Sequence, residues 1–303
     1  MSTTKDVDAV GGPTERDDRV NTLPQYVLPH HFLSGLMRWF TQIEYKPLKE
    51  WQIRTVTRKY QVDLSSAVET NPLAYRTFNH FFTRTLKPSE RPIAAEANAI
   101  ASPVDGAVSQ AGPIRDGRIF QAKGQSFTAQ ELLGGSAERA KPFENGSFAT
   151  IYLSPRDYHR IHTPLDGTLR EMVHVPGRLF SVNQMTVRSV PRLFARNERV
   201  VTIFETPAGP MALVMVAAIF VSGMETVWSG VVTPGPRSKI RTWQYGTPKG
   251  SNVSLKKGEE LGRFNMGSTV ILLFPKSRMN WTTELTPGQS VKMGQLIGHV
   301  NSK

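Results

Sequence analysis

The C-terminal part of the chain is organised around Arg263-Phe264-Asn265-Met266-Gly267-Ser268-Thr269-Val270-Ile271-Leu272-Leu273-Phe274. Its second half, from Thr269 to Phe274, is β-branched and apolar, which predicts a strand buried on both faces. A Gly267-Ser268 pair stands at the entrance of that strand. Glycine permits backbone geometry that other residues cannot adopt, and the serine hydroxyl can reach the carbonyl before it. Taken alone, the pair indicates a tight turn or a bulge that leads into a core strand.

From Arg91 onward the sequence around this stretch has the texture of a β-protein. Short apolar or alternating runs recur, and pairs such as Asp116-Gly117 and Asn145-Gly146 separate them. That spacing predicts a largely antiparallel core, like a sandwich or a barrel. The expected strands include residues 107–109, 148–153, 167–173, 200–206, 211–221 and 226–232, and two glycine-punctuated runs close the chain.

Residues 23–86 have helical periodicity instead. The segment from His30 to Thr41 is predicted to form one amphipathic helix, and the segment from Leu48 to Tyr60 a second one with a basic side. A third helix is expected over Tyr75 to Thr83, with three phenylalanines facing inward. Basic amphipathic helices with tryptophans suit the headgroup region of an anionic bilayer, although they can also pack on a protein core.

These patterns divide the chain into three parts. We predict a disordered tail over residues 1–22, a helical region over 23–86 and a β-rich catalytic domain over 87–303. The fold class expected is mainly β with N-terminal amphipathic helices, α+β overall. The first twenty residues lack the apolar core of a secretory signal, and the run from Met211 to Val221 is too short to span a bilayer. We therefore do not expect an integral membrane protein.

Composition restricts the partners and the chemistry. The formal charge of +12 and a pI near 10.0 point to an anionic partner. Lysines and arginines are scattered, without a recognised nucleic-acid module, so we rank a membrane above nucleic acid. The chain has no cysteine, which excludes disulfides, thiolate metal sites and a cysteine nucleophile.

Two further motifs carry titratable groups. One is Ser102-Pro103-Val104-Asp105-Gly106, which alone is a turn with an aspartate acceptor. The other contains His159 and His162 within Tyr158-His159-Arg160-Ile161-His162. A His-x-x-His pair can bind zinc, but no third ligand stands nearby, and we expect no metal. Asp105, a histidine and Ser268 supply the residue types of a Ser-His-Asp relay, although residue types alone do not say which histidine is the base.

The chain resembles the bacterial phosphatidylserine decarboxylases, pyruvoyl enzymes that make their own cofactor by cutting their backbone. The resemblance runs from about Leu23 to the C-terminus, and Met266 departs from it where the family usually has leucine of similar volume. The motifs that carry it, besides the two above and Gly267-Ser268-Thr269, are Tyr75-Arg76-Thr77-Phe78-Asn79, Gln121-Ala122-Lys123-Gly124, Val175-Pro176-Gly177-Arg178-Leu179-Phe180-Ser181-Val182-Asn183 and Leu193-Phe194-Ala195-Arg196-Asn197-Glu198-Arg199.

The resemblance implies roles for particular residues. Ser268 would attack the carbonyl carbon of Gly267, with His162 as general base and Asp105 orienting it. Self-cleavage would leave chains 1–267 and 268–303, with a pyruvoyl group derived from Ser268 at the new N-terminus. The amine of phosphatidylserine would form a Schiff base with this group, and decarboxylation would yield phosphatidylethanolamine. His159 is expected to act in decarboxylation and protonation, and Ser181 to contact the substrate.

The resemblance also favours the membrane interpretation of the helices. Since the substrate lies in an anionic bilayer, we expect a peripheral enzyme at the cytoplasmic face of the cell membrane and, from the family, a homodimer of processed units. The residues expected to enter the interface are Leu33, Leu36, Met37, Trp39 and Phe40.

Two other classes of protein remain open from the residues alone. A conventional serine hydrolase would use the same triad on an external acyl substrate and keep an intact chain. A non-catalytic lipid-binding module would follow from the basic helices and would also stay intact.

Overall fold

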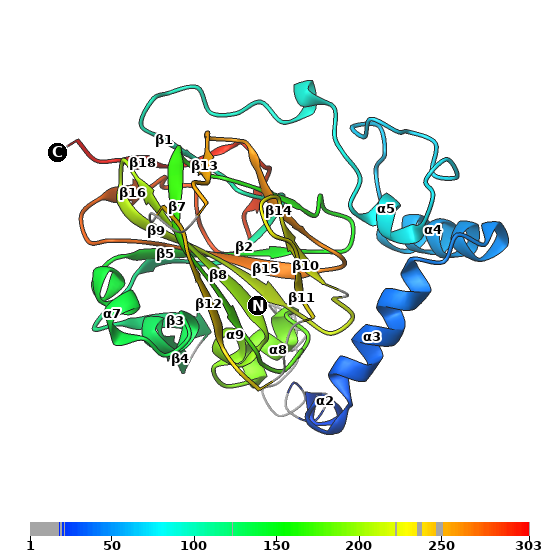
Figure 1. Ribbon diagram of the computed structural model, residues 1–303, viewed down its shortest axis with the longest axis horizontal. Coiled ribbons are helices and arrows are strands. Elements are labelled where there is room, and N and C mark those ends of the chain that lie inside the picture. The colour runs from blue at the N-terminus through cyan, green and yellow to red at the C-terminus, as the bar shows by residue number, and fades with distance from the viewer. Residues whose placement is uncertain are drawn as a thin grey trace, which may run out of the picture.

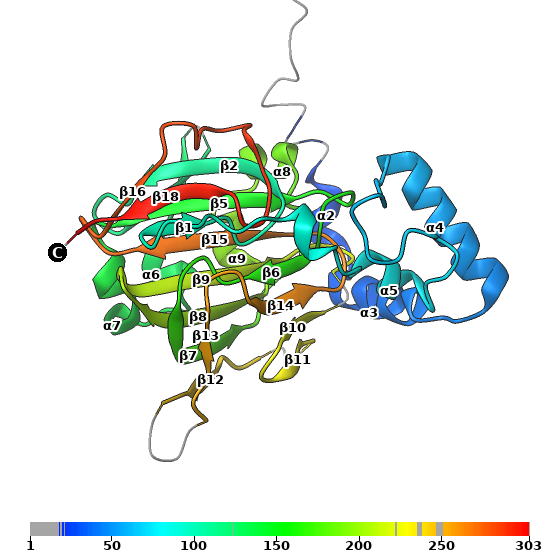
Figure 2. The same ribbon diagram turned by 90° about the horizontal axis from the view of Figure 1, so that it is seen from above.

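The computed structural model describes residues 18, 20, 22–122, 124–221, 223–234, 238–246 and 251–302. Figure 1 shows a β-rich body with a group of helices, α3 to α5, to one side of it, and the view from above in Figure 2 shows the same arrangement. Mainly antiparallel strands with a smaller helical part confirm the α+β class. Within the described ranges, no helix has both the length and the apolar character needed to cross a bilayer.

The largest sheet has nine strands and is built around β15 (Ser268–Phe274). All seven residues of β15 are buried, which confirms the strand predicted from the apolar run. Its neighbours are β5, where Leu153 faces Ser268, and β9, where Ala217 faces it. The order is β12-β7-β8-β9-β15-β5-β2-β17, with β13 paired to β7. The bounds are β2 Gly106–Pro113, β5 Ser147–Leu153, β7 Gly167–Val175, β8 Arg199–Thr206, β9 Gly209–Ala217, β12 Arg241–Gln244, β13 Ser254–Leu255 and β17 Ser290–Val291.

Three smaller sheets complete the β part, in the orders β1-β18-β16, β11-β10-β14-β6 and β3-β4. The single strand predicted over residues 226–232 is wrong, because β10 and β11 form a hairpin there. Gly230 takes a left-handed φ of 63° where the chain turns back, a geometry that glycine adopts at little cost. The bounds are β1 Ala99–Ala101, β3 Arg118–Ala122, β4 Gln125–Thr128, β6 Arg160–His162, β10 Met224–Thr226, β11 Gly230–Thr233, β14 Glu260–Phe264, β16 Met279–Trp281 and β18 Leu296–Val300.

The N-terminal helices are α2 (Pro24–Val27), α3 (His30–Thr41), α4 (Lys46–Tyr60) and α5 (Phe78–Phe82), so the three predicted helices are confirmed with small changes of bounds. The third helix begins later than predicted, at Phe78, because Thr77 is its N-cap and accepts a hydrogen bond from the amide of His80 with its hydroxyl. The other helical segments belong to the β part and are η1 Pro88–Glu90, α6 Ala129–Leu132, α7 Ala137–Ala140, η2 Lys141–Phe143, α8 Gln184–Ser189 and α9 Leu193–Arg196.

Two hydrophobic clusters hold the structure together. The larger one lies within the β part. The smaller one gathers the inner faces of α4 and α5 with Tyr158 and Met293 from the β part, and Met266 packs against it. The helical region therefore rests on the segment that carries the two histidines and on the turn before Ser268.

Two residues within the segment predicted as a disordered tail are buried. The carboxylate of Asp18 accepts two hydrogen bonds from Arg188 of α8, and the Ser189 hydroxyl donates to that of Thr22. The other residues of 1–22 lie outside the described ranges, apart from Val20.

Candidate active site

Ser268 is the first residue of β15, at the point where the chain leaves β14 and enters the centre of the large sheet. The residue is completely buried, and its Oγ has no hydrogen-bond partner within the described part of the chain. The strained residue is Met266, directly before Gly267, because its φ of 91° is one that residues other than glycine rarely adopt. A Cβ built on Gly267 would meet nothing within 4 Å. Gly267 thus leaves open space beside the bond that precedes Ser268.

His159 lies beside this turn and is completely buried. The amide of Phe264 donates to its carbonyl over 3.0 Å, four residues before Ser268. The His159 Nδ1–H donates to the carbonyl of Asp157 (2.8 Å), which leaves an unprotonated Nε2 with no partner in the described residues. Phe82 packs on the ring at 4.1 Å between centroids. Burial lowers the pKa of His159 to about 3, so the ring is neutral.

His162 ends β6 and has both ring nitrogens engaged. Its Nδ1–H donates to the carbonyl of Gly258 (2.8 Å), and the Tyr158 hydroxyl donates to its Nε2 (3.1 Å). Burial is the main cause that lowers the pKa of His162, and it also raises the pKa of Tyr158. Tyr158 therefore occupies the lone pair that a general base at His162 would use.

Asp105 lies in the turn before β2, and its carboxylate is engaged by other groups. Arg91 donates to both oxygens, and the amide of Met293 donates to Oδ1 (2.8 Å). The side chains of this ion pair are only 12% and 11% exposed. The backbones of the two motifs meet directly, since the amide of His162 donates to the carbonyl of Pro103 (2.9 Å).

The structure thus gathers Asp105, His162 and Ser268 in one region without joining them. Among the described residues, no hydrogen bond links any two of these side chains. Asp105 precedes β2, which is separated from β15 by β5. Two strand spacings therefore place the backbones of Asp105 and Ser268 about 10 Å apart. A working relay would require side-chain movement.

Arg84 is a buried group that the sequence reasoning missed. It is 4% exposed, and one of its nitrogens donates to the carbonyl of Arg156 over 2.8 Å. Its Nε and Nη1 are enclosed without a partner in the ranges described here. Burial lowers the pKa of Arg84, and its charge helps to lower that of His159. An arginine two residues after the clustered Phe78, Phe81 and Phe82 was the available signal for a buried cation.

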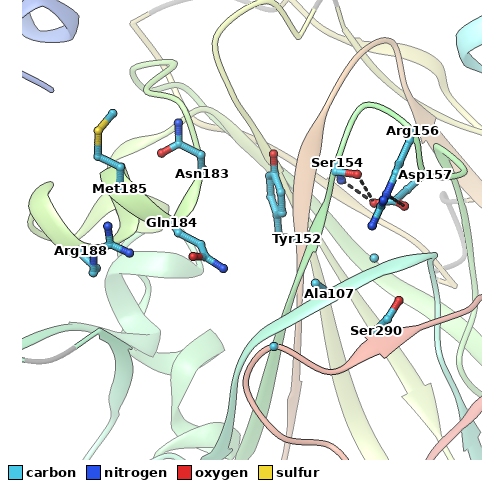
Figure 3. Close-up of a pocket in the computed structure, with 12 residues that line it drawn as sticks. Ala107, Tyr152, Ser154, Arg156, Asp157, Asn183, Gln184, Met185, Arg188 and Ser290 are labelled. Carbon is cyan, nitrogen blue, oxygen red and sulfur yellow. Dashed lines mark hydrogen bonds and ion pairs between the residues drawn. The ribbon is translucent and has the colours of Figure 1, made fainter. Parts of the chain in front are cut away.

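A groove opens next to these residues, in two adjoining lobes of about 590 and 400 Å³. Figure 3 shows Tyr152 at its centre, between α8 on one side and the turn with Ser154 and Asp157 on the other. Tyr152 on β5 pairs with Thr269 on the neighbouring strand β15, and the backbone carbonyl of Asp157 accepts the hydrogen bond from His159 Nδ1–H. The groove thus adjoins the start of β15. Ser181 is not among its lining residues, whereas Asn183 is.

Comparison with known proteins identifies the family. A sequence profile described as phosphatidylserine decarboxylase matches residues 78–299, and one described as PSD matches residues 20–61. The proteins named phosphatidylserine decarboxylase proenzyme in Azotobacter vinelandii and Bordetella pertussis are 53% and 54% identical, over 94% and 92% of this chain and 99% and 94% of their own. The chain belongs to the phosphatidylserine decarboxylase family. It is accordingly a carboxy-lyase. The homologous proenzyme of Idiomarina loihiensis is 50% identical, over 94% of this chain and 98% of its own length.

Helix α3 of this decarboxylase buries polar residues and exposes apolar ones. In α3 the buried residues are the polar His30, Ser34 and Thr41. Phe32, Leu36 and Trp39 are 68%, 51% and 64% exposed. Of the residues expected at the interface, Leu36 and Trp39 are exposed, whereas Leu33, Met37 and Phe40 are half-buried. The sequence reasoning missed Phe32, which follows Pro29 and His30 in the first turn of the helix. We call Phe32, Leu36 and Trp39 the apolar face of α3.

The decarboxylase fold brings few metal-ligating side chains together. Across the described residues, no three His, Asp or Glu side chains are grouped so that they could hold a metal ion. His159 and His162 each donate Nδ1–H to a backbone carbonyl.

Proposed function

We propose that the chain is a proenzyme that cuts itself between Gly267 and Ser268. The cut would give chains 1–267 and 268–303 and a pyruvoyl group derived from Ser268. The observation that carries this proposal is the state of Ser268: an enclosed serine with an unpartnered Oγ, directly after a glycine carbonyl, at the entrance of the central strand. Most buried hydroxyls have a hydrogen-bond partner, so the Oγ of Ser268, unpartnered among the described residues and beside a glycine carbonyl, supports its use as a nucleophile. The proenzyme names of the relatives agree with it.

The chain's own residues can perform the processing. Ser268 Oγ attacks the carbonyl carbon of Gly267 while His162 accepts the hydroxyl proton, and an N-to-O acyl shift converts the peptide bond to an ester. Removal of the Cα proton of residue 268 then expels the Gly267 carboxylate and leaves dehydroalanine. Hydrolysis then replaces the amino nitrogen of this dehydroalanine with oxygen, which gives the pyruvoyl group and releases ammonia. Asp105 supports the charge that His162 gains, and its Coulombic effect raises the pKa of His162 against the effect of burial.

This assignment of the base requires a local rearrangement. The Tyr158 hydroxyl fills the Nε2 lone pair of His162, and Arg91 holds Asp105. Freeing the base requires the Tyr158 hydroxyl to turn away, at a cost of about 1 kcal/mol. His159 has the opposite arrangement, with a free Nε2 lone pair. We assign His159 to the decarboxylation that follows self-cleavage.

We propose that the mature enzyme decarboxylates phosphatidylserine to phosphatidylethanolamine and carbon dioxide. The pyruvoyl group supplies an electron sink for the substrate amine. His159 Nε2 takes up a proton from the substrate ammonium and returns it to the carbon that loses carbon dioxide. The Nε2 lone pair, unpartnered within the described ranges, permits this role, because a neutral imidazole must accept a proton before it can donate one. The enclosure of His159 by Phe82 keeps bulk water from protonating that nitrogen.

We propose further that the apolar face of α3 docks on an anionic membrane at the cytoplasmic side of the cell membrane. An exposed row of Phe32, Leu36 and Trp39 over a buried polar face fits an interfacial helix better than a surface helix of a water-soluble domain. Basic residues on α4 would meet anionic headgroups. A homodimer of processed units stays a prediction, which light scattering of the purified enzyme would test.

Denaturing mass spectrometry of the purified protein tests the processing directly. We expect two species that meet at Gly267 and Ser268, with the smaller one blocked at its N-terminus. The Ser268→Ala variant should stay intact and lack decarboxylase activity. A full-length species from cells with decarboxylase activity would contradict self-processing. An intact chain that reacts with a fluorophosphonate probe would indicate a serine hydrolase, and an intact inert chain that binds vesicles would indicate a lipid-binding module.

A further inference from the structure

The segment from Gly177 to Arg188 forms one wall of the groove through its second half, Val182 to Arg188. Asn183, Gln184, Met185 and Arg188 line the larger lobe, on the side opposite Asp157 (Figure 3). The first half of this segment, Gly177 to Val182, has no helix or strand of its own. Its conformation therefore depends on contacts with other parts of the chain.

Helices α2 and α3 supply three of these contacts through side chains. The amide of Ser181 donates to Gln25 Oε1 (2.9 Å), and the amide of Leu179 donates to His30 Nδ1 (3.3 Å). His31 Nε2–H donates to the carbonyl of Gly177 over 2.9 Å. These bonds satisfy alternate positions of an irregular segment, as the rungs of a strand would.

An aromatic contact reinforces them. The ring of Phe180 packs between Tyr26 (5.0 Å between centroids) and His30 (5.3 Å), and the guanidinium of Arg196 lies over it at 4.9 Å. From the other side, the side-chain amide of Asn197 pairs with both the amide and the carbonyl of Phe180. The segment is held between the N-terminal helices and the turn after α9.

We propose that Gln25 and His31 are positioning residues: they fix the first half of the Gly177–Arg188 segment, and through it the second half that walls the groove, and so set how well substrate is held. This inference rests on the proposed function, because it takes the groove as the site of the phosphatidylserine headgroup. Helix α2 and helix α3, whose apolar face we propose to dock on the bilayer, thus also support the groove. Neither residue lines the groove, so both act through the wall.

The chemistry of Gln25 permits a sharp test. Its Oε1 acts as an acceptor, so Gln25→Glu keeps the contact with Ser181, whereas Gln25→Met has similar shape and no oxygen acceptor. His31 acts as a donor, so His31→Gln keeps the bond to Gly177 and His31→Ala removes it. The full-length processed enzyme would be compared for self-cleavage, hydrogen–deuterium exchange of peptides covering 177–188, and decarboxylation of short-chain phosphatidylserine in detergent.

For Gln25→Met and His31→Ala we expect complete self-cleavage, faster exchange in 177–188 and a KM raised about three- to tenfold with kcat within about twofold. Gln25→Glu and His31→Gln should restore the wild-type KM and exchange. Unchanged exchange and KM in Gln25→Met and His31→Ala would overturn the proposal, as would conservative variants that are equally defective. If the wild type lacks decarboxylase activity, the proposed function fails, while the exchange comparison still decides whether the wall is held by these residues.

Discussion

The apolar face of α3 offers the most quantitative prediction. Replacing Phe32, Leu36 and Trp39 with serine removes the apolar area that would enter a bilayer and leaves the buried polar face of α3 in place. The three side chains are 68%, 51% and 64% exposed, so little packing inside the protein is lost. We expect each change to alter the free energy of unfolding by within about 0.5 kcal/mol. Self-cleavage should be unaffected.

The expected effect on membrane binding follows from the exposed fractions. Complete transfer of one large apolar side chain from water is worth about 1.5–3 kcal/mol. Scaled by 68%, 51% and 64%, the apolar face contributes about 3–5 kcal/mol. Since each 1.4 kcal/mol changes an equilibrium constant about tenfold, the triple variant should bind vesicles at least about 100-fold more weakly.

Co-sedimentation with anionic vesicles measures this difference. The matched control replaces three exposed apolar residues of the β part with serine, and it should bind as the wild type does. These control residues are Phe120, Val227 and Ile240, which are 46%, 54% and 48% exposed. If the α3 variant binds within about threefold of the control, the docking surface lies elsewhere and the reasoning from α3 is refuted.

Three further perturbations test the site. Arg91→Met leaves the buried Asp105 carboxylate without its cation and should lower the free energy of unfolding, measured by denaturant titration, by about 3–5 kcal/mol. Arg76→Met, in an exposed ion pair, should change it little, and equal effects would contradict the role of burial. The low pKa of His159 keeps the folded form neutral while the unfolded chain protonates below about pH 6.5, so stability is complete above that pH and is lost toward pH 3. His159→Gln should flatten this part of the curve of Tm against pH, and an unchanged slope would argue against it. Tyr158→Phe frees His162 Nε2 and should speed self-cleavage up to about fivefold; slower cleavage would mean that the hydroxyl takes part in proton transfer.

Regular periodicity made much of the fold predictable. The segment from His30 to Thr41 repeats apolar residues at helical spacing, and its predicted bounds are those of α3. The run from Thr269 to Phe274 has no polar residue after Thr269, so its burial on both faces followed from composition. Turn geometry was harder: residues 226–232 contain apolar residues on both sides of Gly230, and the hairpin there depends on pairing with β14.

The candidate site was predictable at the level of motifs and not of contacts. Asp105, His159, His162 and Ser268 belong to short recognisable stretches, and the fold brings these stretches to one region. The hydrogen-bond partners of these side chains, however, come from residues far away in the chain. Gly258 lies 96 residues from His162, and Met293 lies 188 residues from Asp105. No local pattern encodes such pairs, since they are set by tertiary packing.

The orientation of α3 could not be read from its sequence either. Apolar residues cover more than one side of this helix, so periodicity alone did not select the exposed row. The deciding contacts are made by polar residues, because His30 and His31 bond to the segment beneath. Phe32 was missed for that reason.

If the chain is cut between Gly267 and Ser268 as we propose, the central position of β15 decides whether the two pieces stay together. Ser268 is the first residue of a strand that is hydrogen-bonded on both sides, by β5 and by β9. A chain severed there would stay in place while the sheet is intact, because the short fragment supplies a middle strand of the sheet. Once melted, however, the two fragments would have to find each other again, and recovery would depend on protein concentration. Efficient folding would therefore have to take place in the uncut precursor, before the chain is severed.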